Sequence, residues 1–209
     1  PKVEVNYNHL YQPSFTQFLF MKEFAMDGQP DRIEVKWQES VDYILKAHPW
    51  IPDISKSYLG DYKRGGGSAY EHSHGLAAAL ALFKGLKRED ITDLKVDAGY
   101  VGTYDPTGDY DDRMKMTFNC RGVALSVTTD FTSKEVKKSI LMTKDDHFVS
   151  LDFSGKEDVL TWERNGGSGK RGFPRTREDQ FVNGLRGALK PTLDTYNIGK
   201  LAVQLIGEC

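Results

Sequence analysis

The sequence predicts an α+β domain built on a large, mostly antiparallel open sheet with helices on one face. Short segments in which apolar and polar residues alternate fill the middle of the chain. Segments with apolar residues at helical spacing are grouped before and after them, which is typical of α+β domains. We expect one domain over residues 1–209, with the other sheet face meeting water or a partner subunit.

The N-terminal part predicts a strand, a helix and a second strand. Apolar residues alternate from Val3 to Tyr7, helical spacing begins after Pro13 and Gly28 is a typical helix stop. Alternation returns from Ile33 to Trp37, which indicates another strand. Residues 38–67 lack sustained periodicity, so they are expected to form a long loop.

The rest of the chain predicts a buried helix, a series of strands and two closing helices. The first helix spans Ala77 to Lys84, and the closing helices span Arg177 to Leu189 and Leu193 to Glu208, parted by a proline. The predicted strands are Leu94–Tyr100, Met114–Cys120, Val123–Phe131, Ser139–Met142, Phe148–Phe153 and Val159–Trp162. Arg121 and Gly122 separate two of them at hairpin distance.

Composition excludes several classes of protein. A formal net charge of -2 over 209 residues gives no field that would attract nucleic acid. The longest apolar run, Gly75 to Phe83, is far shorter than the about 20 residues of a membrane span. Only two cysteines occur, which predicts no disulfide framework and no zinc site of cysteines. We therefore expect a soluble, cytoplasmic protein.

Two glycine-rich or acidic segments resemble binding motifs only superficially. The segment Asn165 to Gly172 lacks the spacing of a phosphate-binding loop and is interpreted as a flexible surface loop. No GxGxxG fingerprint of a dinucleotide-binding domain occurs. The acidic cluster around Asp105, Asp109, Asp111 and Asp112 does not follow the order of a calcium loop, which favours a solvated turn.

The segment Gly65 to His74 is the strongest candidate for a functional site. Three glycines, a carboxylate and two imidazoles stand just before an apolar helix, where polar groups need partners or a function. Helix capping and core hydrogen bonds are one interpretation. Zinc ligation by Glu71, His72, His74 and the distant His48 is another, although their spacing matches no established pattern.

This region resembles the C-terminal domain of the glucose-fructose oxidoreductase and inositol dehydrogenase (Gfo/Idh/MocA) family. The residues that carry the resemblance are His48, Pro49, Trp50, Asp53, Ser57, Tyr58, Gly65, Gly66, Gly67, Glu71, Ser73 and His74. The likeness extends to the opening strand, to the segment Tyr11 to Pro13 and to residues 178–181. It thus covers most of the chain.

The resemblance implies a nicotinamide-dependent oxidoreductase that acts on a secondary hydroxyl of a sugar, cyclitol or nucleotide sugar. In such proteins a Rossmann domain that binds NAD or NADP precedes this one, and the sheet supplies a homodimer interface. Because Pro1 leads almost directly into a strand and the last helix still reads apolar at its end, we expect a fragment without that domain. The fragment alone is expected to bind no cofactor and to be inactive. A stand-alone, non-catalytic binding module on the same scaffold is the alternative.

The resemblance also implies roles for individual residues. His74 falls at the family's catalytic histidine, which handles the proton of the reacting hydroxyl, and Glu71 falls at the acidic position before it. Three positions apart at a helix start, the two residues would share one face. The backbone at Gly65, Gly66 and Gly67 is expected to lie near the cofactor or substrate. No metal is expected.

Aromatic residues outside the glycine segment are the remaining candidates for substrate contact. They are Trp50 and Tyr58 in the long loop and Tyr11 before the first helix. The sequence departs from the family at two places. Ala77 stands where members often have Asp, and Leu10 stands where they often have Arg. These departures leave the identity of the substrate open.

Overall fold

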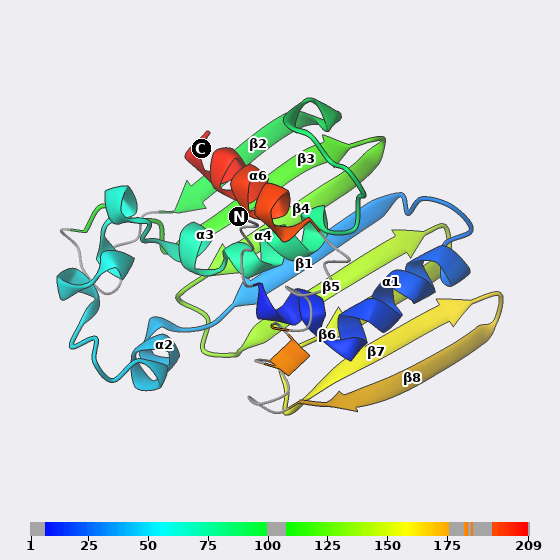
Figure 1. Cartoon of the computed structure of the whole chain (residues 1–209), viewed down its shortest axis with the longest axis horizontal. Helices are drawn as coiled ribbons and strands as arrows, with labels where there is room; N and C mark the ends of the chain where they lie inside the picture. The colour runs from blue at the N-terminus through cyan, green and yellow to red at the C-terminus, as the bar shows by residue number, and fades with distance from the viewer. Residues whose placement is uncertain (1–6, 100–107, 176–181, 184, 186–193, 209) are drawn as a thin grey trace.

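The computed structural model describes residues 7–99, 108–175, 182–183, 185 and 194–208. Their centre is an eight-stranded open sheet in the order β2-β3-β4-β1-β5-β6-β7-β8 (Figure 1). The strands are β1 Arg32–Gln38, β2 Ile91–Gly99, β3 Arg113–Cys120, β4 Val123–Asp130, β5 Lys137–Lys144, β6 His147–Asp152, β7 Glu157–Arg164 and β8 Gly167–Pro174. The predicted α+β class with a mostly antiparallel open sheet is confirmed.

The pairing of β1 joins the two halves of the sheet. β1 runs parallel to β4 and antiparallel to β5, whereas all other neighbouring strands are antiparallel. Its alternating residues Ile33, Val35 and Trp37 are buried under the helices. In this register Trp37 lies beside Thr129 on one side and Lys138 on the other. This places a lysine among the buried rings at one end of the sheet.

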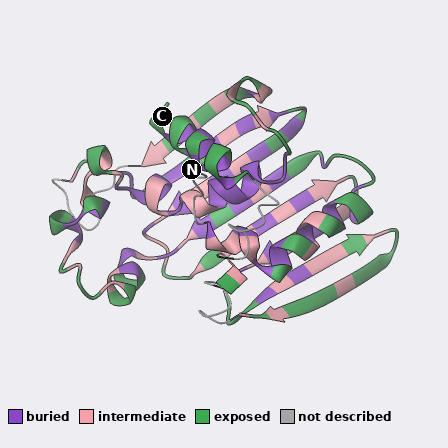
Figure 2. Ribbon diagram, in the orientation of Figure 1, coloured by how far each residue is buried: buried purple, intermediate pink, exposed green. Residues whose placement is uncertain are grey.

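The helices of the described residues gather on one face of the sheet, as predicted (Figure 1). They are α1 Pro13–Ala25, α3 Ser68–Glu71, α4 Ser73–Leu80 and α6 Thr195–Gly207, while α2 Val41–Ala47 lies beyond the end of the sheet. α1 packs on β6 and β7, and α4 packs on β1 and against α6. Buried residues concentrate where these helices meet the sheet (Figure 2). No helix of the described residues covers the opposite face (Figure 1).

Small residues let α4 approach β1 closely. A Cβ atom added at Gly75 would lie 3.0 Å from the Cβ of Trp37. Ala77, Ala78 and Ala79 follow and are fully buried. The helix begins earlier than the predicted Ala77 and ends at Leu80, because the chain turns there into the tight segment that carries Gly85 at φ 60°. The first turn of α4 is therefore held against the central strand.

The segment 38–67 was expected to be a loop, and this prediction is wrong in detail. It contains α2 and three short 3-10 helices: η2 Ile54–Lys56, η3 Tyr58–Gly60 and η4 Tyr62–Arg64. Side chains of Ser40, Asp53, Ser57 and Asp61 accept hydrogen bonds from backbone amides at the four starts. Such caps make short turns without any apolar periodicity. A small second core also anchors this segment; it comprises Val41, Ile44, Ile54, Leu59, Tyr110 and Phe131.

The segment Asn165 to Gly172 is not a surface loop but a turn followed by most of β8. Asn165 and Gly166 have φ values of 51° and 74°, as a tight hairpin requires. The indole of Trp162 on β7 lies directly over Gly169, where any Cβ would overlap it. The glycines of this edge strand make a close cross-strand contact possible. A glycine-rich sequence is also typical of flexible loops, which is why a loop was predicted here.

The acidic cluster is also different from the expected solvated turn. Asp111 and Asp112 are buried, with 2% and 0% of their surface exposed. Asp111 accepts hydrogen bonds from the Ser68 hydroxyl at 2.5 Å and from the Ala69 amide at 3.0 Å, so it caps α3. Asp105 lies outside the described residues. The cluster therefore belongs to the folded core near the glycine segment.

Two further predictions lie largely outside the described residues. Val3 and Val5 of the predicted opening strand lie outside it, and Tyr7 stands before the 3-10 helix η1 Asn8–Tyr11 without belonging to a strand. The predicted helix 177–189 lies mostly outside, whereas the last predicted helix is confirmed as α6. The Arg121 and Gly122 hairpin is confirmed, and η5 Arg88–Asp90 precedes β2. Of the helices in the described ranges, none is long and apolar enough to cross a membrane.

Candidate active site

His74 lies in the first turn of α4, at the end of the sheet where β1 stops. Its ring stacks nearly parallel to the Trp37 indole, with ring centres 6.2 Å apart and planes 12° apart. Tyr7 and His9 meet the same ring edge-on at 5.3 and 5.8 Å. The short helix and the close contact at Gly75 fix this position. His74 is half-buried, and its Nδ1 atom is buried without a hydrogen-bond partner.

The surroundings keep His74 uncharged at neutral pH. Burial, followed by the positive charge of Lys138, lowers the pKa of His74 to about 4. Lys138 itself is paired with Glu39 at 2.9 Å, and both side chains are largely buried. An imidazole that is neutral at pH 7 can accept or donate a hydrogen bond and can take up a proton. This is the state that a proton-handling histidine needs before it reacts.

His72, the other histidine of the segment, is a core residue. It is 2% exposed and packs edge-on against Phe131 with ring centres 5.2 Å apart. Burial lowers the pKa of His72 to about 3, and hydrogen bonds with the backbone of Glu39 and Asp130 act against this lowering. No three His, Cys, Asp or Glu residues of the described ranges come together to hold a metal ion. These residues give the zinc interpretation no support.

Glu71 is engaged by Tyr58 and not by His74. The Tyr58 hydroxyl donates a hydrogen bond to the Glu71 carboxylate at 2.8 Å. Burial and the Glu71 charge raise the pKa of Tyr58 well above its ordinary value. The expected common helix start is interrupted, because α3 ends at Glu71 and α4 begins after His72, whose ψ is 19°. Glu71 and Tyr58 therefore form a pair that ties the 38–67 segment to the end of α3.

The three glycines make close contacts within the chain. A Cβ at Gly66 would overlap the Tyr58 carbonyl oxygen, and one at Gly67 would overlap the Asp111 carboxylate. Gly67 also has a φ of 92°, whereas a Cβ at Gly65 would meet nothing within 4 Å. Two of the three glycines are thus required by packing alone. Their proximity to a cofactor remains a prediction.

The other aromatic candidates lie in different surroundings. Trp50 is 73% exposed and meets His48 edge-on at 5.1 Å, in the segment that follows α2. The Tyr11 hydroxyl donates to the Thr195 hydroxyl at 3.2 Å, which ties η1 to the start of α6. Leu10 is buried. Neither Trp50 nor Tyr11 is in ring contact with His74 in the described part of the chain.

Sequence reasoning missed the residues that surround His74 from other elements. His9 comes from η1 and Lys138 from β5, and both are far from His74 in the sequence. The alternation around Trp37 gave the only usable signal, because its cross-strand partner is Lys138. Finding that pair requires the β1 to β5 register, which the sequence does not display.

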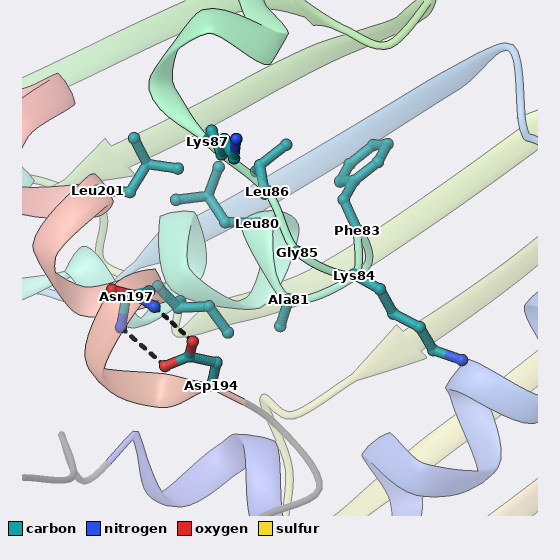
Figure 3. Close-up of a pocket in the computed structure, with 11 residues that line it drawn as sticks. Leu80, Ala81, Phe83, Lys84, Gly85, Leu86, Lys87, Asp194, Asn197 and Leu201 are labelled. Carbon is teal, nitrogen blue, oxygen red and sulfur yellow. Dashed lines mark hydrogen bonds between the residues drawn. The ribbon is translucent and has the colours of Figure 1, made fainter.

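A separate cavity of about 390 Å3 lies between the end of α4 and the start of α6 (Figure 3). Leu80, Leu201 and the chain around Gly85 form its walls. Two of its polar residues, Asp194 and Asn197, are hydrogen-bonded to each other as the cap of α6. None of the site residues predicted from the sequence lines this cavity.

Comparison with solved structures identifies the fold. Aldose-aldose oxidoreductase from Caulobacter crescentus, solved with glycerol, matches with a TM-score of 0.74 at 13% identity, over 99% of this chain and 60% of that chain. The 3-ketoreductase KijD10 from Actinomadura kijaniata, solved with NADP and TDP-benzene, matches with a TM-score of 0.68 at 14% identity, over 97% and 59%. An NAD-binding oxidoreductase from Klebsiella pneumoniae gives 0.65 at 13%, over 88% and 55%.

These likenesses confirm the predicted fold resemblance to the C-terminal domain of Gfo/Idh/MocA oxidoreductases. The chain spans less than two thirds of the length of each solved protein. No protein-family model and no curated protein matches the sequence.

Proposed function

We propose that this chain is the substrate-binding part of an NAD- or NADP-dependent oxidoreductase that acts on a secondary hydroxyl of a sugar-like molecule, in the cytoplasm. The observation that carries the proposal is His74, a neutral, half-buried imidazole set in a cluster of rings on a scaffold shared with sugar oxidoreductases. A nicotinamide ring, when bound, supplies the acceptor or donor of the hydride. His74 would take up the hydroxyl proton during oxidation and return it during reduction.

The described residues do not supply the phosphate site of a dinucleotide. The glycines at 65–67 lead into α3, but the carboxylate of Asp111 already caps the start of this four-residue helix. A second anion there would meet that negative charge. We therefore propose that the cofactor is held by another part of a longer protein, and that residues 1–209 alone bind neither NAD nor NADP. Titration calorimetry that detects micromolar binding by this chain would contradict this.

The proposal assigns different roles to His74 and to the surrounding side chains. General acid-base groups contribute about 10² to 10⁴ in rate, so His74→Ala in the complete enzyme should lower kcat by that order and leave cofactor affinity unchanged. Glu71→Gln should lower it less, because Glu71 positions the pocket wall through Tyr58. His147→Ala, a change at a histidine on β6 that bonds Asn165, is the matched control. Wild-type kcat in a folded His74→Ala protein would refute the assignment.

We also propose a homodimer or higher assembly through the open sheet face. One row of cross-strand neighbours on this face is half-buried and consists mainly of small polar residues: Thr117, Ser126, Glu34, Leu141, Ser150 and Thr161. Such a row permits another surface to approach closely. Ser150→Arg should shift the mass measured by light scattering toward the monomer, whereas Ser55→Arg on the exposed η2 segment should not. An unchanged mass for Ser150→Arg would place the interface elsewhere.

A further inference from the structure

His9 brings a second imidazole to the site, from an element remote in sequence. It lies in η1, directly before α1, and its ring meets His74 at 5.8 Å, Trp37 at 5.0 Å and Phe153 at 5.1 Å. The neighbouring Leu10 and Tyr11 point elsewhere, since Leu10 is buried in the core and Tyr11 bonds Thr195. Thus the His9 ring of η1 contacts His74, as does the ring of Tyr7 just before this helix.

Both imidazoles have the same unusual hydrogen-bonding state. The Nδ1 atoms of His9 and His74 are buried and have no hydrogen-bond partner. In a neutral imidazole one nitrogen donates and the other accepts. A buried acceptor without a partner is tolerated better than a buried N–H without one, so the proton of His9 is expected on Nε2. His74 has to present an unprotonated Nε2 to take up the hydroxyl proton. No hydrogen bond links either Nε2 to the described side chains or backbone, which leaves a donor on His9 and an acceptor on His74 for a ligand.

The charges around the two rings are already compensated. Burial, followed by the nearby His74, Lys138 and Arg175, holds the pKa of His9 well below its ordinary value. Lys138 is paired with Glu39 at 2.9 Å. Arg175 is paired at 3.3 Å with the buried carboxylate of Asp158. Among the described residues, no cation facing the rings is therefore left to bind a carboxylate or phosphate, and an uncharged hydroxyl suits the donor and the acceptor better.

We propose that His9 is a second substrate-contacting residue, which donates a hydrogen bond to one oxygen atom of a neutral polyol while His74 accepts one from the reacting hydroxyl. This inference rests on the proposed function and adds a residue and a charge preference to it. The part of the substrate that lies between the two rings is uncharged. A phosphate or nucleotide group of a larger substrate would have to lie beyond them.

The test is a ligand titration of the full chain with 15N-labelled histidine, followed by NMR. The probes are glucose as a neutral polyol and glucuronate as its acidic counterpart. We expect the Nε2 signals of His9 and His74 to shift together with glucose, and glucuronate to bind at least tenfold more weakly. His9→Phe, which keeps a ring but removes the donor, should weaken glucose binding about tenfold, and His9→Asn should restore part of it. His147→Phe is the matched control.

Each outcome decides between the inference and the function on which it rests. A glucose-induced shift of His74 without a shift of His9 overturns the inference and leaves the proposed function standing. Equal binding of glucuronate overturns the charge preference. If neither ring responds to either probe, the substrate site itself is wrong and both fall. Circular dichroism and unfolding midpoints of the variants separate loss of binding from loss of fold, and His9→Asn covers the case in which His9→Phe does not fold.

Discussion

Protonation of His72 should set the acid limit of this fold. His72 is 2% exposed, and burial lowers its pKa to about 3, whereas an unfolded histidine titrates near 6.5. Below pH 6.5 the unfolded chain binds a proton at His72, whereas His72 in the folded chain stays neutral. The stability due to neutral His72 is therefore complete above pH 6.5 and is lost as the pH falls from 6.5 toward 3.

The size of the effect follows from the two pKa values. Each pKa unit corresponds to 1.36 kcal/mol, so going from pH 6.5 to pH 5 should cost about 2 kcal/mol through His72 alone. His74, with a pKa lowered to about 4, adds to the loss in the same window. Burial raises the pKa of Asp111 and Asp158, which works in the opposite direction as the pH falls. Because these groups overlap, the His72 contribution must be read as a difference between two proteins.

Urea unfolding followed by tryptophan fluorescence at pH 7 and pH 5 measures that difference. His72→Gln keeps a hydrogen-bond donor but cannot be protonated. Its free energy of unfolding should therefore fall by about 2 kcal/mol less than that of the wild type between the two pH values. The matched control His147→Gln, a change at a histidine outside the core, should follow the wild type. Equal losses in wild type and His72→Gln would show that His72 is not the buried neutral group described above.

Three further changes test the site and its support. Gly67→Ala should lower the free energy of unfolding by more than about 2 kcal/mol, because φ is 92° and the new Cβ would overlap Asp111; urea titration measures this. Lys138→Met should raise the pKa of His74, as followed by NMR titration, because it removes the nearby positive charge. Trp50→Ala should change stability by less than about 0.5 kcal/mol since the side chain is 73% exposed. A larger loss would indicate that Trp50 anchors the segment after α2.

The sequence predicted the sheet well because alternation marks one-sided strands directly. The runs at 33–37, 114–120 and 123–131 became β1, β3 and β4 with the expected residues buried. β8 was missed because its glycines and charged residues leave no apolar face, and its order depends on the Trp162 contact. The turns in 38–67 were missed because they depend on capping side chains, which have no periodicity.

The candidate site was only half predictable for a related reason. The sequence places Gly67, Glu71 and His74 together because they are neighbours in the chain. His9 and Lys138 reach the site through the positions of η1 and β5, which depend on long-range pairing. The pairing of Glu71 with Tyr58 depends likewise on the fold of the intervening segment.

The central place of β1 has a consequence for how the chain must fold. β1 pairs on one edge with β4, whose residues come about ninety positions later, and on the other edge with β5, later still. The hairpins on either side of β1 can form from local contacts. The two halves of the sheet cannot join through β1 until both have been synthesised. Until then β1 has two unpaired edges and its Ile33, Val35 and Trp37 face no completed core. Closing so long a loop costs chain entropy before packing contributes any stabilising free energy. Docking of β1 is therefore expected to limit the folding rate.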